Sequence, residues 1–200
     1  MNTCYTTITN GYDELKPCPE AEGWEYIVFA DRFLDVAPWR CIVTGKHNRD
    51  LKIKSHGEMH RNLTLYVDGS IEIIGDLNEL IKEVSNRFAA WKHPHRDRLE
   101  EEARAVIKLK GCNPGLVWQQ VEKYTKEGYK GDTLAACGVL LRDLSDSVVR
   151  DVNNTWYNEW VGSCGRDQIS FLYSCWKHGI EPDLFSNEVF NRYFRWGNHL

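Results

Sequence analysis

The sequence predicts a single α/β domain, because short apolar strands dominate its first 75 residues and amphipathic helices dominate the rest. The early apolar runs are brief, rich in β-branched and aromatic side chains, and bounded by Gly, Pro, Asp or Asn, as buried strands are. They lie at 4–8, 25–30, 41–43 and 63–67. No linker, internal repeat or low-complexity tract divides the 200 residues, so we expect one domain with two halves of about 1–75 and 76–200.

The second half carries helical patterns with recognisable ends. Asp76 and Glu79 form a helix start signal, and the apolar residues that follow recur at helical spacing as far as Phe88. A second helix is expected over 96–110, before Gly111, and a third from Asn113-Pro114 to about Gly128. A strand over 134–142, helices over 147–160 and 166–178, and an irregular aromatic tail folded over the sheet complete the prediction.

Composition narrows the class of protein. Seven cysteines, an odd number without a Cys-x-x-Cys pair, argue against a disulfide framework and a zinc finger and favour a reducing compartment. The first ten residues do not resemble a signal peptide, and no run of eighteen apolar residues occurs, so we expect no membrane span and a soluble, cytoplasmic protein. The net charge of -4 provides no general attraction to nucleic acid.

Asp68 follows the apolar strand 63–67, and a second short strand resumes after it. An acid at the end of a buried strand lies where α/β folds place their ligand sites. Asp68 could therefore bind a cation that bridges a diphosphate. Alternatively, Asp68 and Gly69 form an ordinary hairpin turn.

Polar residues also follow the first two strands. Thr6 and Thr7 precede a flexible Asn-Gly pair, whose backbone could approach a nucleotide or form a simple turn. Asp31 follows the second strand and could accept hydrogen bonds from a base or ribose, or cap a loop.

Two cationic segments have similar ambiguity. Arg49, Lys52 and His56 would share one face of a helical turn, where they could bind a diphosphate or remain a solvated basic face. The segment His93-Pro94-His95-Arg96 should hold His93 in an extended turn, because Pro94 disfavours helical geometry in the residue before it. This segment could supply a metal ligand or contact a phosphate.

The segment Arg166-Asp167-Gln168 begins a predicted helix. It follows a flexible stretch at 162–165, and Glu159 lies just before that stretch. A carboxylate at a helix start has its pKa lowered by the amide groups. Asp167 could be only a helix cap, or it could be the general base that deprotonates an acceptor hydroxyl.

These segments, taken in order, resemble a glycosyltransferase-like family of GT-A type that is known from plant mucilage or Golgi-type proteins and from bacterial proteins. The match runs from Tyr5 to about Gly179. Its pieces are Tyr5-Thr6, Phe29-Ala30-Asp31, 49–56, Tyr66-Val67-Asp68-Gly69, 93–96, 120–128 and, the most specific, Arg166-Asp167-Gln168-Ile169-Ser170-Phe171.

The resemblance implies a GT-A-like domain, with a mixed, mostly parallel central sheet flanked by helices. It implies a hexosyl- or pentosyltransferase that moves a sugar from a nucleotide-diphosphate donor, with a UDP-sugar favoured, to a hydroxyl of a saccharide or other acceptor. Residues 1–75 would bind the nucleotide and 76–200 the acceptor. The implied donor residues are Thr6, Thr7, Asp31, Arg49, Lys52, His56, Asp68, Gly69 and Arg96. The implied acceptor residues are His93, Glu159, Arg166 and Gln168, with Asp167 as general base in an inverting reaction.

The family pattern also implies a Mn or Mg site at Asp68 and Ser70. Ser70 stands where the second acid of an Asp-x-Asp motif would be, and Ser55 replaces a proline. One rival function is therefore a non-catalytic domain that binds a nucleotide or glycan. Another is transfer to a hydroxylated nucleobase in DNA, which requires a basic groove built from 49–54, 92–98 and 192–195.

Overall fold

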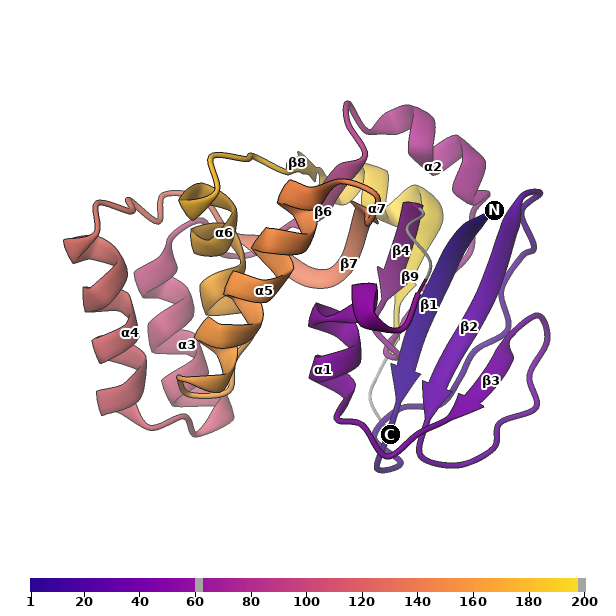
Figure 1. Cartoon of the computed structure of the whole chain (residues 1–200), viewed down its shortest axis with the longest axis horizontal. Coiled ribbons are helices and arrows are strands. Elements are labelled where there is room, and N and C mark those ends of the chain that lie inside the picture. The colour runs from indigo at the N-terminus through magenta and orange to yellow at the C-terminus, as the bar shows by residue number, and fades with distance from the viewer. Residues whose placement is uncertain (60–62, 198–200) are drawn as a thin grey trace.

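The main sheet of the protein has seven strands in the order β3-β2-β1-β4-β7-β6-β8 (Figure 1). The computed structural model describes residues 1–59 and 63–197, without the side chain of His56. The strands are β1 (Asn2–Ile8), β2 (Trp24–Ala30), β3 (Arg40–Val43), β4 (Leu63–Val67), β6 (Phe88–Lys92), β7 (Ala135–Asp143) and β8 (Asp183–Phe185). Strand β7 is antiparallel to both neighbours, whereas the other pairs are parallel. The predicted mixed, mostly parallel sheet is confirmed.

Alternating side chains of the strands feed two separate cores. On one face, Tyr5 and Tyr66 pack against α1 (Asn48–Ile53), α5 (Ser147–Val161) and α6 (Gln168–Lys177). The helices α3 (Leu99–Lys110) and α4 (Pro114–Lys126) lie outside the sheet and pack against α6. A short 3-10 turn, η1 (Ser55–Gly57), follows α1.

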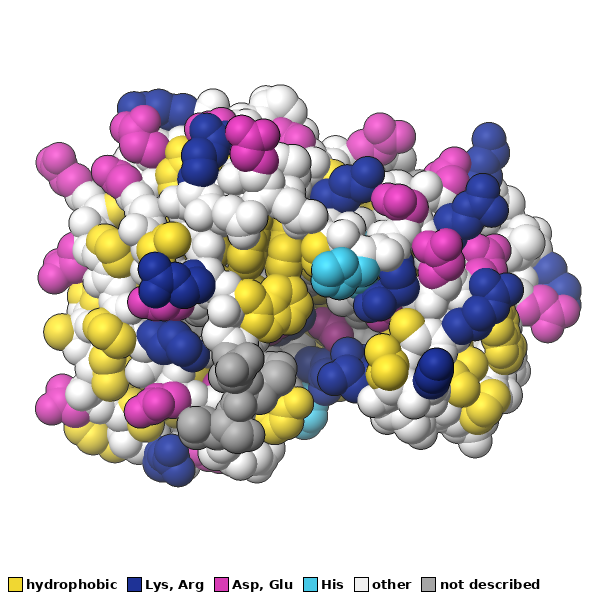
Figure 2. All heavy atoms as spheres, turned by 180° about the vertical axis from the view of Figure 1, so that it is seen from behind, with side chains coloured by type: hydrophobic (Ala, Val, Ile, Leu, Met, Phe, Trp, Pro, Cys, Tyr) yellow, Lys and Arg dark blue, Asp and Glu magenta, His cyan; other side chains and the backbone are white. Residues whose placement is uncertain are grey.

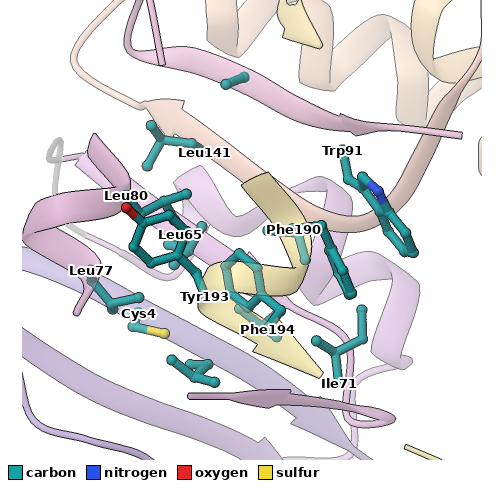
Figure 3. Packing of buried hydrophobic residues seen from close by; sticks show 14 of the residues in the cluster. Cys4, Leu65, Ile71, Leu77, Leu80, Trp91, Leu141, Phe190, Tyr193 and Phe194 are labelled. Atoms are coloured by element: carbon teal, nitrogen blue, oxygen red, sulfur yellow. The ribbon is translucent and has the colours of Figure 1, made fainter. Parts of the chain in front are cut away.

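The opposite face is covered by α2 (Leu77–Glu83), α7 (Asn187–Tyr193) and a small sheet of β5 (Ile71–Ile73) and β9 (Phe194–Trp196). Figure 3 shows Phe190, Tyr193 and Phe194 gathered in this core with Cys4 and Leu65. Both ends of the sequence therefore contribute to one core.

The predicted helices with local end signals are confirmed. Asp76 accepts a hydrogen bond from the backbone N–H of Asn78 at 2.8 Å, Gly111 adopts the left-handed conformation after α3, and Asn113 caps α4. The expected continuation of the first helix to Phe88 is wrong, because α2 ends at Glu83 and Phe88 begins β6. The irregular tail is also wrong: β8, α7 and β9 lie there, and their partners are distant in sequence.

The Asp68 turn forms, but not as part of a hairpin. The backbone N–H of Ile71 donates to the carbonyl of Asp68 at 2.8 Å, yet β5 pairs with β9 and not with β4. A Cβ atom on Gly69 would lie 2.5 Å from Ile8 Cδ1 and 2.9 Å from Asp13 Cβ. Glycine is therefore needed for the close approach of this turn to the loop after β1.

Candidate functional site

A cleft opens at the edge of the main sheet where the parallel strands end. Asp68 follows β4, His93 follows β6, and Gly138 of β7 lies between them. The cleft has a volume of about 310 Å³ and adjoins a polar recess of about 110 Å³. Figure 2 shows the hollow, with Lys, Arg and His side chains around it. This is the edge at which open α/β sheets bind ligands.

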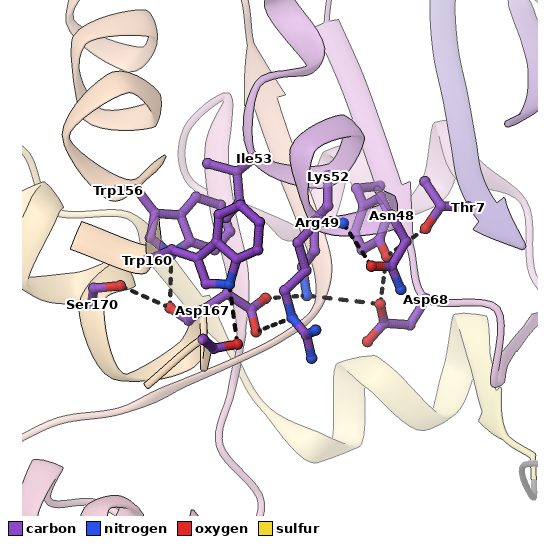
Figure 4. Close-up of polar contacts among 12 residues, drawn as sticks. Thr7, Asn48, Arg49, Lys52, Ile53, Asp68, Trp156, Trp160, Asp167 and Ser170 are labelled. Carbon is purple, nitrogen blue, oxygen red and sulfur yellow. Dashed lines mark hydrogen bonds and ion pairs between the residues drawn. The ribbon is translucent and has the colours of Figure 1, made fainter. Parts of the chain in front are cut away.

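Charged side chains line the recess, and Figure 4 shows four of them: Arg49, Lys52, Asp68 and Asp167. The Nζ of Lys52 lies 2.7 Å from Asp167 Oδ2 and 3.7 Å from Asp68 Oδ1. The Nε of Arg49 donates to Asp167 Oδ1 at 3.3 Å. Lys52 and Arg49 come from α1, so the predicted cationic helical turn does meet both aspartates.

Lys52 and Asp167 are buried and hold each other in the charged state. Burial lowers the pKa of Lys52, but the carboxylates of Asp167 and Asp68 outweigh this effect and raise it above the ordinary value. Burial likewise raises the pKa of Asp167, but Lys52 and Arg49 outweigh it and hold that pKa well below the usual range. Asp167 is therefore a weak base in this arrangement.

Asp167 stands at the start of α6 without capping it. Its side chain makes no hydrogen bond to the helix, while its carbonyl accepts from Trp156 Nε1 at 2.7 Å and from Ser170 Oγ at 3.2 Å. These bonds hold the backbone so that the carboxylate faces α1. The cap interpretation of Asp167 is thus not supported by its geometry.

Asp68 is more open. Its side chain is 40% exposed, and its Oδ1 accepts a hydrogen bond from Tyr66 OH at 2.5 Å. Thr7 Oγ1 lies 3.4 Å from the same phenol oxygen, so Thr7 supports Asp68 through Tyr66. Burial and the neighbouring carboxylate of Asp68 raise the pKa of Tyr66, which keeps its proton available for this bond.

Arg142 is a buried residue for which the sequence predicts no role. Its guanidinium donates to the carbonyls of Lys52 at 2.6 Å and Ile53 at 3.4 Å, and to Asn153 Oδ1 at 2.9 Å. A cation at the end of a helix is stabilised by the helix carbonyls. Arg142 therefore fixes the turn that carries Lys52. An arginine at the end of the apolar run 134–141 was the available signal.

His93 and Arg96 line the cleft beside this cluster. The Nδ1 of His93 accepts from the backbone N–H groups of His95 and Arg96 at 3.1 and 2.9 Å, and its Nε2 contacts Arg96 Nη2 at 2.8 Å. Arg96 Nε also donates to the buried Glu102 at 2.6 Å. Burial, with the nearby cation of Arg96, lowers the pKa of His93 to about 4. His93 thus shapes the turn with Nδ1 rather than offering that atom to a ligand.

Arg166 and Gln168 also line both the cleft and the recess. The Nε of Arg166 is buried and has no hydrogen-bond partner in the part of the chain that the structure describes. Ser70 and Gly69 lie at the turn beside the cleft, and only Ser70 lines it.

The structure places three predicted site residues elsewhere. Asp31 is exposed and accepts from the backbone N–H of Asn10 at 2.5 Å, which ties together the loops after β1 and β2. The hydroxyl of Thr6 is buried away from the cleft. Glu159 accepts from Tyr124 OH at 3.0 Å and pairs with Lys123 within the helical half. The side chain of His56 lies outside the described part of the structure.

The donor set does not fit a resident Mn or Mg ion. Over residues 1–59 and 63–197, no three His, Cys, Asp or Glu side chains gather where they could hold a metal. Of the two predicted ligands, Asp68 supplies a carboxylate whose Oδ1 already faces a phenol and an ammonium, and Ser70 supplies none. Divalent cations of this type prefer several oxygen ligands.

The fold and the cleft define an α/β domain with a charged ligand site where the parallel strands end. The chain belongs to the TOD1/MUCI70 family of glycosyltransferase-like domains, whose match covers residues 59–199. An apo structure of the bifunctional glycosyltransferase WbbM is similar to this chain, with a TM-score of 0.56 and 11% sequence identity. That match covers 91% of this chain and 38% of the WbbM chain. A comparison with curated proteins found no match. In the described residues, no helix has the length and apolar character needed to cross a bilayer.

Proposed function

We propose that this domain is a glycosyltransferase that moves a hexose or pentose from a nucleotide-diphosphate sugar, with a UDP-sugar favoured, to a hydroxyl of a saccharide or other acceptor. The observation that carries the proposal is the convergence of Lys52, Arg49 and Arg166 on the ligand edge of the sheet, beside Asp68. Family membership supports the same class of activity.

The chemistry needs positive charge at this edge. When the bond between sugar and diphosphate breaks, negative charge develops on the leaving nucleotide. Fixed cations that face this charge stabilise the transition state, especially in a recess with little water. Lys52 and Arg49 are held by Asp167 before any ligand arrives, so the electrostatic environment is preorganised.

The acceptor hydroxyl must lose a proton as it attacks the anomeric carbon. Asp167 stays our proposed general base for an inverting reaction, but its lowered pKa weakens it in that role. A retaining reaction would need no such base, and Asp167 would then serve only to hold Lys52 and Arg49. Asp167→Asn distinguishes these roles.

The test of the proposed function begins with donor consumption. Wild-type protein is incubated with UDP-, GDP- and CDP-sugars, and release of the nucleotide is measured. Asp68→Ala should lower the rate of release by about a hundredfold, the effect typical of losing an electrostatic group at a reacting centre. Asp151→Asn, on the exposed side of α5, is the matched control and should leave the rate unchanged. Retained turnover in a folded Asp68→Ala protein would reject this site.

A non-catalytic binding domain is the second candidate, because Ser70 replaces an expected acid. It predicts nucleotide binding by calorimetry without hydrolysis or transfer with any donor. Transfer to a hydroxylated nucleobase has less support, since Arg192 and Arg195 pair with Glu83 and Glu72 and leave little free positive charge there.

A further inference from the structure

We propose that Lys52 is the built-in cation of the donor site, so that the domain binds the diphosphate of its donor without a divalent metal ion. This inference rests on the proposed function. The resemblance already implies that Lys52 contacts the donor; the inference adds that its ammonium takes the place of a metal ion, which family membership does not imply. The family match begins at residue 59, after Lys52 and Arg49.

The first argument is position. The Nζ of Lys52 lies between two carboxylates, 2.7 Å from Asp167 and 3.7 Å from Asp68. A metal ion that used both carboxylates would have to take the place of this ammonium. Lys52 is buried and its ammonium is paired with Asp167, so this group already occupies that place.

The second argument is rigidity. The carbonyl of Lys52 accepts hydrogen bonds from Arg142 Nη2 at 2.6 Å and from Tyr5 OH at 3.1 Å. These two bonds fix the backbone of Lys52, while Asp167 fixes the ammonium at the other end of the side chain. A cation held in this way does not need to reorganise when the diphosphate arrives.

The third argument is charge balance in the recess. Its lining includes the cations of Arg49, Lys52 and Arg166 and the carboxylates of Asp68 and Asp167. Three positive and two negative charges leave one positive charge, and Arg166 Nε has no partner within the described residues. Guanidinium and ammonium groups bind phosphate oxygens directly through charge-assisted hydrogen bonds. The recess therefore has both charge and donors available for a diphosphate.

The fourth argument is the state of Asp68. Its Oδ1 accepts from Tyr66 OH at 2.5 Å and faces Lys52, and the residue two positions later is serine. An acid that already orients an ammonium is explained without a metal: it holds the second side of Lys52. Asp68 and Asp167 thus act as a pair that directs this lysine toward the recess.

The first experiment uses wild-type protein and inorganic pyrophosphate, which shares its chemistry with the donor diphosphate of any nucleotide sugar. Calorimetry measures binding of pyrophosphate and of UDP in EDTA and in excess Mg²⁺ or Mn²⁺. We expect the affinity in EDTA to lie within about threefold of that with metal, less than 1 kcal/mol of difference. Binding that appears only with metal would overturn the inference.

The second experiment tests the residue. Lys52→Met should lower the affinity for pyrophosphate in EDTA by about a hundredfold, as the loss of a buried ionic contact does. Lys54→Met is the matched control, because Lys54 lies over the ring of Tyr157 at 4.1 Å and should leave binding unchanged. Lys52→Met/Asp167→Asn removes both charges of the pair and provides a second variant if Lys52→Met unfolds. Wild-type affinity in either folded variant would reject the role of Lys52.

Turnover separates this inference from the proposed function. If the release of nucleotide from a sugar donor requires metal, the glycosyltransferase function is retained and the metal independence is rejected. Absence of binding and turnover for every donor, with and without metal, would instead reject the proposed function itself. Turnover in EDTA that Lys52→Met abolishes and Lys54→Met preserves supports both.

Discussion

Asp167 illustrates how the surroundings of one residue decide its chemistry. The sequence predicted a carboxylate at a helix start, and the structure turns that carboxylate toward two cations from α1. Asp167→Asn leaves Lys52 buried with its closest partner neutralised, and we expect the free energy of unfolding to fall by about 3 kcal/mol. Urea denaturation measures this change, and a loss below 1 kcal/mol would contradict the ion-pair role. If inverting catalysis uses Asp167, the variant also keeps donor binding while turnover becomes weak; unimpaired turnover would remove the base assignment.

His93 gives the protein a separate pH dependence. Its pKa is lowered from an ordinary 6.5 to about 4, so between these values the unfolded chain binds a proton that the folded chain does not. Stability should therefore fall as pH drops from about 6.5 to 4, by up to about 1.4 kcal/mol per pH unit. Asp167 has a lowered pKa as an acid, and its contribution is lost only below its ordinary value of 3.8. Denaturation curves across this range should show the slope, and His93→Asn should flatten it.

At the scale of elements, the C-terminal end of α1 is held in place by Arg142 of β7, which lies 90 residues after Lys52. Arg142 donates to the carbonyls at the end of α1, and it also donates to the neutral side chains of Asn153 and Ser55. Arg142→Lys cannot reproduce contacts to several acceptors at once, because an ammonium lacks the planar fork of a guanidinium. We expect a loss of about 2 kcal/mol in unfolding free energy and weaker pyrophosphate binding. Arg32→Lys, at an exposed loop position, is the control; equal effects of the two substitutions would contradict the positioning role.

Elements whose ends carry local signals were predictable, and those defined by distant partners were not. The starts of α2 and α4 follow from Asp76 and Asn113, since a cap is a contact between near neighbours. Phe88 instead fits the helical spacing of the segment before it, yet it pairs with Arg142 in β7. The same holds for β9, whose identity depends on β5. The spacing of hydrophobic residues alone does not predict which strands pair.

At the scale of the whole molecule, the sheet order explains which site predictions converge. Asp68 and Asp167 meet because β4 lies in the middle of the sheet and α6 begins at its ligand edge. Asp31 follows β2, two strands away in the order, and its carboxylate ties loops there. The sequence predicts Asp68 and Asp31 at the ends of strands, but it does not indicate the order of those strands in the sheet. For the same reason the sequence does not predict Trp196 as a site residue, because Trp196 lies at the cleft through the pairing of β9 with β5.

Trp196 therefore provides a test of how the last strand contributes to the site. It lines the cleft, is 56% exposed, and packs edge-on against Trp91 with the ring centroids 5.2 Å apart. An exposed aromatic face beside a polar site can pack against the apolar face of a bound ring, worth about 1 kcal/mol. Trp196→Ala should raise the KM for a saccharide acceptor by roughly fivefold and leave donor hydrolysis unchanged, because the cationic recess stays intact. Trp118→Ala, at an exposed position on α4 outside the cleft, is the control. A change in donor hydrolysis without a change in the acceptor KM would place Trp196 with the donor instead.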